Sequence, residues 1–422
     1  MGVNMKYYKK SKRDIAIDKN VKDQVSEIIE DIRKFKDKSI LKYNIKFDNN
    51  QRDNLRISRE EIKKAYEDVD EKFIDNLRIA AENIEKFARL QKENFNDFEK
   101  EIYPGVILGQ KNIPINSALA YVPGGGYPLF STALMLIIPA RIAGVERICA
   151  CSPTMKNCDQ INPKTLVAMD IAGANEIYAF GGIQSIAAFT YGTDSIKPVD
   201  IIVGPGNKYV TEAKRQCYGD VGIDFVAGPS EVLIMADESA NPLYIAADLL
   251  AQCEHDYSAR GILVTNSEAL AIEVEKNINI LLETLPTREV AQSAWFNNGE
   301  IIIVDNINQA LDICNDYAPE HLEVNLKDSE EVINKLKNYG SLFIGENSAE
   351  VFGDYVSGTN HTLPTLRAAR YTGGVWVGTF IKTCTNQRLS KKAVESLGPI
   401  ACALAEDEGL YGHANAAKVR NH

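Results

Sequence analysis

The polar and apolar residues of the first hundred positions follow a helical period. In the stretch 57–95, apolar side chains recur every three or four residues between Lys, Asp and Glu side chains. This spacing puts the apolar residues on one face of each helix, so the pattern predicts a set of amphipathic helices. A solvated helical brace is the simplest role for this region.

The pattern changes near residue 117 to short apolar runs, each followed by a glycine-containing turn and a helical stretch. This alternation is typical of β-α-β units that build a parallel sheet. The predicted strands are 118–122, 146–152, 176–180 and 200–204, and the predicted helices are 163–174, 184–192 and 208–219. The apolar run 133–145 is interrupted by Pro139 and Arg141 and is too short to span a bilayer, so we expect it in the core.

A second series with the same alternation begins near residue 230. Its predicted strands are 231–237, 261–266, 300–306, 321–326 and 341–345, and its predicted helices are 241–256, 267–285, 307–317 and 329–340. Two successive units of this kind predict an α/β protein with two Rossmann-like parallel-sheet domains and a cleft between them.

The chain closes with a polar, glycine-rich loop over 346–378 and a helical stretch over 390–420. Helices beyond both sheets must pack on their own subunit or on another. We therefore expect four regions, which are an N-terminal helical region 1–116, a nucleotide-binding-like domain 117–229, a second α/β domain 230–378, and a C-terminal helical extension 379–422 that contacts a partner subunit.

Net charge and cysteine content indicate which partners and which cellular compartment are compatible with this sequence. The chain has 58 acidic against 47 basic residues and a net charge of -11, which argues against nucleic acid or an anionic membrane as the main partner. The first twenty residues hold no continuous apolar stretch, so we expect no secretory signal. The eight cysteines form no C-x-x-C pair and indicate reduced, buried thiols in the cytoplasm.

Histidine is scarce, and its placement is informative. Of five histidines, His255, His321, His361 and His413 each stand beside carboxylates or small polar residues. A single histidine is more often structural than a ligand, but four such neighbourhoods favour a common site.

Two of these neighbourhoods could supply metal ligands. Gln252 and His255 are three residues apart on one face of a predicted helix, so their side chains can point at one ion. Asp354 and His361 lie in the predicted loop near Gly353 and Gly358, and these glycines let the backbone turn both side chains inward. An ordinary Asp- and Gly-rich turn would also explain the second pair.

Glu320 and His321 follow Pro319 and precede a predicted strand. Adjacent residues on extended backbone point to opposite sides, so one could take a proton from an alcohol while the other handles water. The glycine-rich segments 121–128 and 203–207 each follow a strand and precede a helix, where backbone amides can approach a cofactor phosphate. Neither is G-x-G-x-x-G, and tight turns explain them equally well.

Taken in order, a set of short motifs from about residue 20 to the end of the chain resembles the histidinol dehydrogenase family. The motifs are YVPGG, GGxQ, VGPGN with TEAKRQ, AGPSEVLIMAD, DLLAQCEHD, APEHLE, GDYVSGTNHTLPT and GLYGHA. Each is weak alone, and the ordered set is specific.

The resemblance implies a zinc enzyme that oxidises L-histidinol through histidinal to L-histidine with two NAD, in histidine biosynthesis. It implies the zinc ligands Gln252, His255, Asp354 and His413. His321 would remove the hydroxyl proton, and Glu320 would activate water against the aldehyde. It implies substrate contacts at Ser230, His361 and Glu408 and cofactor contacts at Tyr121, Gln184 and Asn207. The family also implies a homodimer in which the C-terminal segment of one subunit reaches the active site of the other.

The stretch 367–390 is less like the biosynthetic enzymes of the family. It is similar to paralogues that oxidise other small alcohols, including sulfonated propanediols, and such a zinc and NAD dehydrogenase is the alternative. A zinc hydrolase that uses Glu320 to activate water is a hypothesis from another class, although the chain lacks H-E-x-x-H. A metal-binding scaffold without activity is the least favoured.

Overall fold

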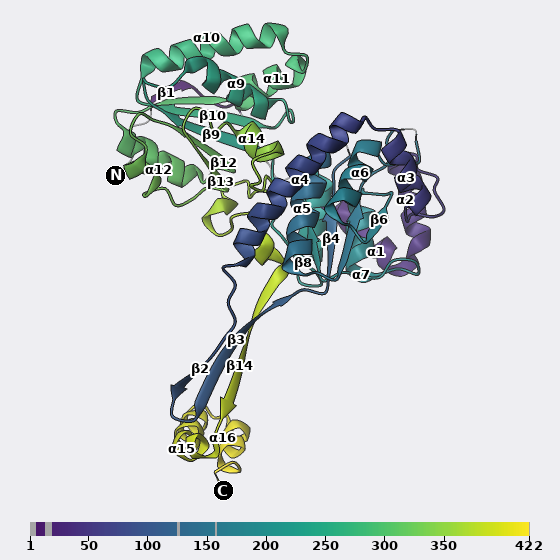
Figure 1. Ribbon diagram of the computed structural model, residues 1–422, viewed down its shortest axis with the longest axis vertical. Coiled ribbons are helices and arrows are strands. Elements are labelled where there is room, and N and C mark those ends of the chain that lie inside the picture. Colours follow the sequence, from purple (N-terminus) through teal and green to yellow (C-terminus); the bar gives the residue numbers. More distant parts are fainter. Residues whose placement is uncertain (1–5, 13–18, 125–126, 157, 422) are drawn as a thin grey trace.

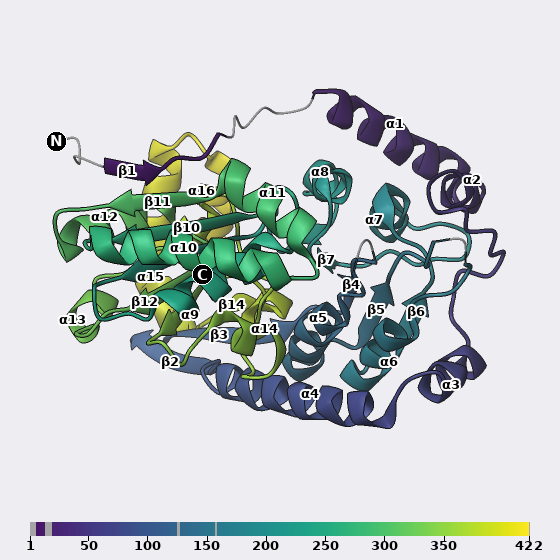
Figure 2. The same ribbon diagram turned by 90° about the horizontal axis from the view of Figure 1, so that it is seen from above.

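The computed structural model describes residues 6–12, 19–124, 127–156 and 158–421. Two α/β bodies lie side by side, and a long arm extends from them (Figure 1). The N-terminal part of the chain is shared between the bodies, because its first strand joins one sheet and its helices pack on the other (Figure 2).

The first body is built on a five-stranded parallel sheet in the order β6-β5-β4-β7-β8. The strands are β4 Ser117–Tyr121, β5 Arg147–Cys151, β6 Glu176–Tyr178, β7 Ile201–Val203 and β8 Gly222–Ile223. Strand β4 comes first along the chain and lies in the middle. The strand order therefore reverses between β4 and β7, and ligands of open α/β sheets bind at the carboxyl ends of strands at such a reversal.

Alternate residues of β4 enter two different cores, as the period of a strand requires. Ala118 and Ala120 pack with the helices α3 Arg59–Glu67, α4 Glu71–Lys92, α5 Phe130–Ala143 and α6 Pro163–Ala172. Leu119 and Tyr121 pack with the helices α1 Lys19–Phe35, α2 Asp37–Asp48, α7 Gly182–Tyr191 and α8 Lys208–Cys217. The predicted amphipathic helices of the N-terminal region thus complete both helical layers of the first sheet.

The apolar run at 133–145 forms most of α5, which is buried along nearly its whole length. This confirms that the run belongs to the core. Among the described residues, no helix has the length and apolar character needed to cross a membrane.

The second body is built on a six-stranded sheet in the order β1-β11-β10-β9-β12-β13. The parallel strands are β9 Glu231–Ala236, β10 Arg260–Thr265, β11 Glu300–Ile303, β12 His321–Asn325 and β13 Ser341–Ile344, and β1 Lys6–Lys9 pairs antiparallel with β11. Its helices are α9 Pro242–Cys253, α10 Glu268–Thr284, α11 Arg288–Asn298, α12 Ile307–Tyr317 and α13 Glu330–Ile333. The order again reverses beside the first strand of the series, between β9 and β12.

The arm is a three-stranded antiparallel sheet that carries two helices at its tip (Figure 1). Its strands are β2 Phe98–Tyr103, β3 Val106–Pro114 and β14 Ile381–Leu389, and the tip helices are α15 Lys391–Asp407 and α16 Tyr411–Lys418. The remaining elements, which precede β14, are α14 Glu350–Tyr355 and the short 3-10 helices η1 Ala368–Arg370 and η2 Val377–Phe380.

The predicted α/β class with two Rossmann-like parallel sheets is confirmed. The expectation of purely helical extensions is wrong in part, because 1–116 also contains β1, β2 and β3, and 379–422 begins with β14. The outer arm strands β2 and β14 are largely exposed and contain many polar residues, so they lack the apolar signal of a buried strand. The four regional boundaries stay a prediction.

Candidate active site

The centre of the candidate site lies at the amino ends of β9 and β12. Glu320 immediately precedes β12, His321 is its first residue, and both side chains are buried. The Glu320 carboxylate accepts a hydrogen bond of 2.9 Å from the backbone N–H of Glu231, the first residue of β9. The strand pairing of the parallel sheet therefore holds the two adjacent residues in place.

Glu320 and His321 face the same space. His321 Nδ1 lies 3.8 Å from Glu320 Oε2, so the expectation that the two side chains point to opposite sides is wrong. The regular alternation of a strand begins only at His321, which leaves Glu320 free to turn toward the ring.

The surroundings of the His321 ring indicate which nitrogen carries the proton. Nδ1 is 3.3 Å from the carbonyl oxygen of Glu231 and 3.4 Å from Glu350 Oε1, both of which are acceptors. Nε2 is buried without a hydrogen-bond partner among the described residues. A neutral ring with its proton on Nδ1 satisfies this environment and leaves the Nε2 lone pair available.

Burial shifts the ionisation of both residues toward their neutral forms. Burial, together with nearby His255 and His361, lowers the pKa of His321 to about 3. It raises the pKa of Glu320 well above its ordinary value, while hydrogen bonds from the Glu231 backbone and the Ser230 side chain oppose the rise. Ser230 therefore lies beside the predicted catalytic pair, at the start of β9.

Three of the four predicted metal ligands lie together next to this pair. Ligand atoms of His255, Glu350 and Asp354 are all within 4.8 Å of one another. Gln252 is fully buried. Its side-chain amide faces Glu350 and lies 2.5 Å from Glu350 Oε1. His255 is the exposed member, so the cluster is open on its side.

Glu350 is a site residue that the sequence analysis missed. It is four residues before Asp354, and both lie on α14, so they share a helix face. The prediction of a loop over 346–378 is wrong at this point, because the short helix α14 lies within it. The cause was the glycine at 353, which is buried inside α14.

Buried carboxyl groups crowd this part of the structure. Burial raises the pKa of Asp354 to about 7 and the pKa of Glu350 well above its ordinary value, and Asp354 raises the Glu350 value further. Asp354 Oδ1 has no hydrogen-bond partner in the described part of the chain. Buried acceptors without donors are costly unless a proton or a cation joins them.

His361 links the site to the first body. Its Nε2 is 3.1 Å from Ser131 Oγ on α5, and neighbouring Asn360 donates to the carbonyl of Met135 at 2.6 Å. Burial lowers the pKa of His361 to about 4. The segment between α14 and η1 therefore brings residues of the second body against the first.

The remaining predicted ligand and the third substrate residue do not join this cluster within one chain. His413 is on α16, and Glu408 follows α15. Both helices sit at the far tip of the arm, away from the two bodies (Figure 1).

The predicted cofactor residues lie at the carboxyl edge of the first sheet. Tyr121 ends β4, and its hydroxyl accepts a hydrogen bond of 3.2 Å from the backbone N–H of Gly182. Gln184 is buried on α7 and donates to Asn44 at 3.1 Å. Asn207 is exposed and caps α8 by accepting from the backbone N–H groups of Tyr209 and Val210. Part of the segment 121–128, residues 125–126, lies outside the described residues.

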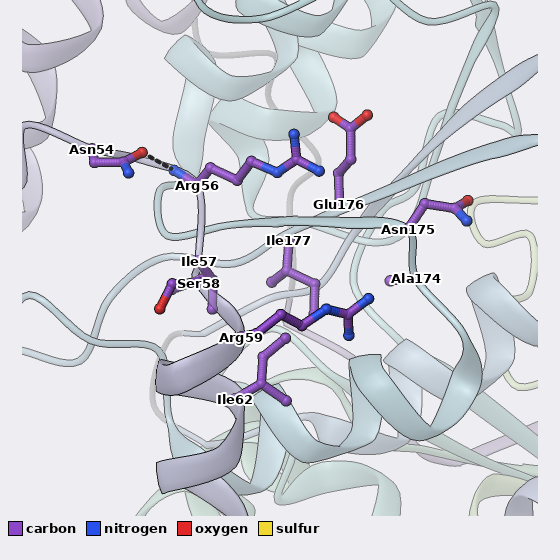
Figure 3. A pocket seen from close by; sticks show the side chains of 10 residues that line it. All are labelled: Asn54, Arg56, Ile57, Ser58, Arg59, Ile62, Ala174, Asn175, Glu176 and Ile177. Carbon is purple, nitrogen blue, oxygen red and sulfur yellow. Dashed lines mark hydrogen bonds between the residues drawn. The ribbon is translucent and has the colours of Figure 1, made fainter.

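A surface cavity of about 340 Å³ lies elsewhere on the first body (Figure 3). It runs along the edge strand β6 and is lined by residues of 54–62 and 174–177, with Arg56 and Arg59 directed into it. None of the predicted site residues lines it, so it is separate from the candidate active site.

The chain is similar to known proteins along nearly its whole length. The model of the histidinol dehydrogenase family matches residues 11–421. A histidinol dehydrogenase from Caldanaerobacter subterraneus is 44% identical over all of this chain and 96% of its own, and a histidinol dehydrogenase homolog from Shouchella clausii is 42% identical over 95% and 94%.

A crystal structure of histidinol dehydrogenase from Elizabethkingia anophelis superposes with a TM-score of 0.91 at 40% identity and covers 97% of this chain and 94% of its own. Family members are NAD-dependent oxidoreductases, which leaves the hydrolase hypothesis without support. This chain belongs to the histidinol dehydrogenase family.

Proposed function

We propose that this protein oxidises L-histidinol through histidinal to L-histidine in two NAD-linked steps, with a zinc ion in the site. The observation that carries the proposal is the buried His321 ring, whose Nδ1 lies beside Glu320 and whose unpartnered Nε2 faces Asp354 of the metal-ligand cluster. A site that removes a hydroxyl proton and later activates water needs two adjacent acid/base groups of this kind.

The residues around His321 fit a divalent cation. The Gln252 amide lies 2.5 Å from Glu350 Oε1, where without a cation its N–H faces the carboxylate, and its oxygen would be the ligand atom when an ion is bound. Asp354 Oδ1 is buried without a donor, and His255 adds an imidazole nitrogen within 4.8 Å. Mixed nitrogen and oxygen ligands suit zinc. When bound, the ion would polarise the substrate oxygen and lower the pKa of its hydroxyl.

Proton handling falls to this chain's own residues. His321 Nε2 accepts the hydroxyl proton, while Nδ1–H remains directed at the Glu231 carbonyl and Glu350. The carboxylate oxygens near Nδ1 favour the charged ring that results. Glu320, held by the Glu231 N–H, takes the proton from water in the second step. Its raised pKa makes it a stronger base than an exposed carboxylate.

The first sheet supplies the place for NAD. Its strand order reverses between β4 and β7, and the predicted cofactor residues Tyr121 and Asn207 follow these two strands. His361 and Asn360 hold the second body against α5, which begins after the loop that follows β4. The nicotinamide therefore can reach a substrate at His321 from the first body.

A second copy of the chain would complete the site. The tip of the arm exposes large apolar side chains, including Ile400, Leu404 and Tyr411, which a monomer would leave in water. We propose a homodimer in which the arm of one subunit brings His413 to the metal and Glu408 to the ammonium group of an amino alcohol in the other. A cytoplasmic location is part of the proposal, because the eight cysteines are free.

The test is the stoichiometry of NADH with pure substrate. Purified protein given limiting L-histidinol and excess NAD should form about two NADH per histidinol, because the alcohol is oxidised to a carboxylate. A chelator should abolish the reaction, and added zinc should restore it. Absence of turnover with histidinol would reject the substrate.

A paralogous dehydrogenase of another small alcohol is the second candidate. The segment that departs from the biosynthetic enzymes begins beside Leu366 and Arg367, which hold left-handed backbone conformations with φ of 53° and 66°. Leu366 packs over Gly228 in the loop that leads to Ser230. The same assay with a sulfonated propanediol decides between the two substrates.

A further inference from the structure

Lys214 and Asp224 form a buried ion pair that hydrogen-bonds to both the backbone N–H and the backbone C=O of Gly204, in the turn after β7. Lys214 on α8 donates to the carbonyl of Gly204 at 2.8 Å and forms an ion pair with Asp224 Oδ1. Asp224 Oδ2 accepts from the backbone N–H of Gly204 at 2.8 Å. The two side chains are 2% and 1% exposed, so the pair is sealed from water.

The turn that this pair holds is tightly placed. Gly204 has a φ of +122°, and a Cβ atom there would lie 2.2 Å from the carbonyl oxygen of Tyr121 at the end of β4. The turn therefore passes against the neighbouring strand with no room for adjustment. It lies between β4 and β7, where the strand order of the first sheet reverses.

A buried ion pair is a poor device for stability alone. Removing two charges from water costs about as much as their attraction returns, and apolar residues of similar size often serve a core equally well. Here one hydrogen bond from each member of the pair goes to Gly204, three positions before Asn207, the predicted cofactor contact, and Asp224 also accepts from the backbone N–H of Phe225. Buried polar groups of this kind fix the geometry of the backbone that they contact.

We propose that Lys214 and Asp224 are positioning residues for the dinucleotide, acting through the backbone of 204–207. This inference rests on the proposed function, because it takes NAD to be the ligand at this edge of the sheet. The pair sets the direction of the turn and of the first N–H groups of α8, without touching the cofactor or the reacting atoms.

The experiment is a comparison of NAD binding by Lys214→Met, Asp224→Asn and the parent full-length protein, using calorimetry. We expect NAD to bind about tenfold more weakly to both variants, the effect of losing one hydrogen bond to a charged group. Zinc content and the affinity for histidinol in the absence of NAD should not change, because those groups lie in the second body. Unchanged NAD affinity in both variants would overturn the inference.

A matched control is available one residue further along α8. Arg215 forms an ion pair with Glu212, and about half of the Arg215 side chain is exposed. Arg215→Met therefore removes one positive charge, as Lys214→Met does, but leaves the contacts of Gly204 intact. This variant should bind NAD as the parent does. Equal weakening in Arg215→Met would assign the effect to overall charge and overturn the inference.

The double variant Lys214→Met with Asp224→Leu covers the case in which a single variant fails to fold. It removes both charges at similar volume and leaves no unpaired buried charge, so it should be more stable than either single variant and still bind NAD weakly. A stable double variant with parental NAD affinity would overturn the inference alone. A parent that binds no NAD would overturn the proposed function with it, so the two failures are distinguishable.

Discussion

His321 Nε2 and Asp354 Oδ1 lie 3.8 Å apart, and neither atom has a hydrogen-bond partner in the part of the chain that the structure describes. One belongs to the predicted acid/base pair and the other to a predicted metal ligand. Two buried acceptors at this distance need two partners, and a cation at the Asp354 oxygen with a substrate hydroxyl that donates to Nε2 would satisfy both.

The first prediction separates the roles of the adjacent pair. His321→Asn should lower the rates of both oxidations by about 10²- to 10⁴-fold, because the proton acceptor for the hydroxyl is lost. Glu320→Gln should mainly slow the oxidation of histidinal, since the amide cannot take a proton from water. Stopped-flow assays started from histidinol and from histidinal measure the steps separately. Equal losses at both steps in Glu320→Gln would contradict the assignment.

The second prediction concerns the metal. His255→Ala should weaken zinc binding by at least about tenfold. Loss of a residue that only hydrogen-bonds to a metal ligand already has an effect of this size, and loss of a ligand itself should cost at least as much. Zinc per subunit after dialysis against a weak chelator measures the loss. His361→Asn is the control, because His361 contacts Ser131 and not the ligand cluster, and it should keep its zinc. Normal zinc content in His255→Ala would exclude that residue as a ligand.

The third prediction concerns stability and pH at the edge strand β6. Burial raises the pKa of Glu176, but hydrogen bonds from Arg147 and Tyr178 outweigh it and hold the pKa below its ordinary value of 4.5. A lowered folded-state pKa stabilises the protein above the unfolded value, and this contribution is lost as the pH falls through the folded value.

Glu176→Gln should therefore lower the free energy of unfolding by about 1 kcal/mol at pH 7, and the difference from the parent should shrink as the pH falls below 4.5. Urea titrations at pH 7 and at an acid pH measure this. Glu146→Gln replaces an exposed carboxylate in the same region and should change little at either pH. A Glu176→Gln effect that persists undiminished in acid would show that the ion pair is not its cause.

The sheets could be predicted from the sequence because most of their strands contain short apolar runs, such as those of β9 and β10, that are buried on both faces. The arm could not be predicted. Its strand β2 carries three consecutive charged residues in solvent, and no local pattern signals that β3 pairs with β14, where Asn112 and Thr383 are 271 positions apart. Pairings at such separation follow from the whole fold rather than from local preference.

Sequence could suggest the site residues that stand close together in a motif, such as Gln252 and His255 or Glu320 and His321. It could not suggest residues that only the tertiary fold brings to the site. Glu350 reads as one more acidic residue in a polar segment, and only the structure places it within 3.4 Å of His321 Nδ1. The buried pair of Lys214 and Asp224 likewise depends on β8 returning beside the turn after β7.

The claim on which the account depends is that the arm of one subunit completes the site of the other, and subunit complementation tests it most directly. His321→Asn and His413→Ala should each be inactive alone, because the first lacks the proton acceptor and the second lacks a ligand for the partner's metal. Unfolded together and refolded in equal amounts, they should regain about a quarter of the parental activity, since half of the dimers are mixed and each mixed dimer has one intact site. Mixed dimers that form, as native mass spectrometry can show, but stay inactive would contradict the account.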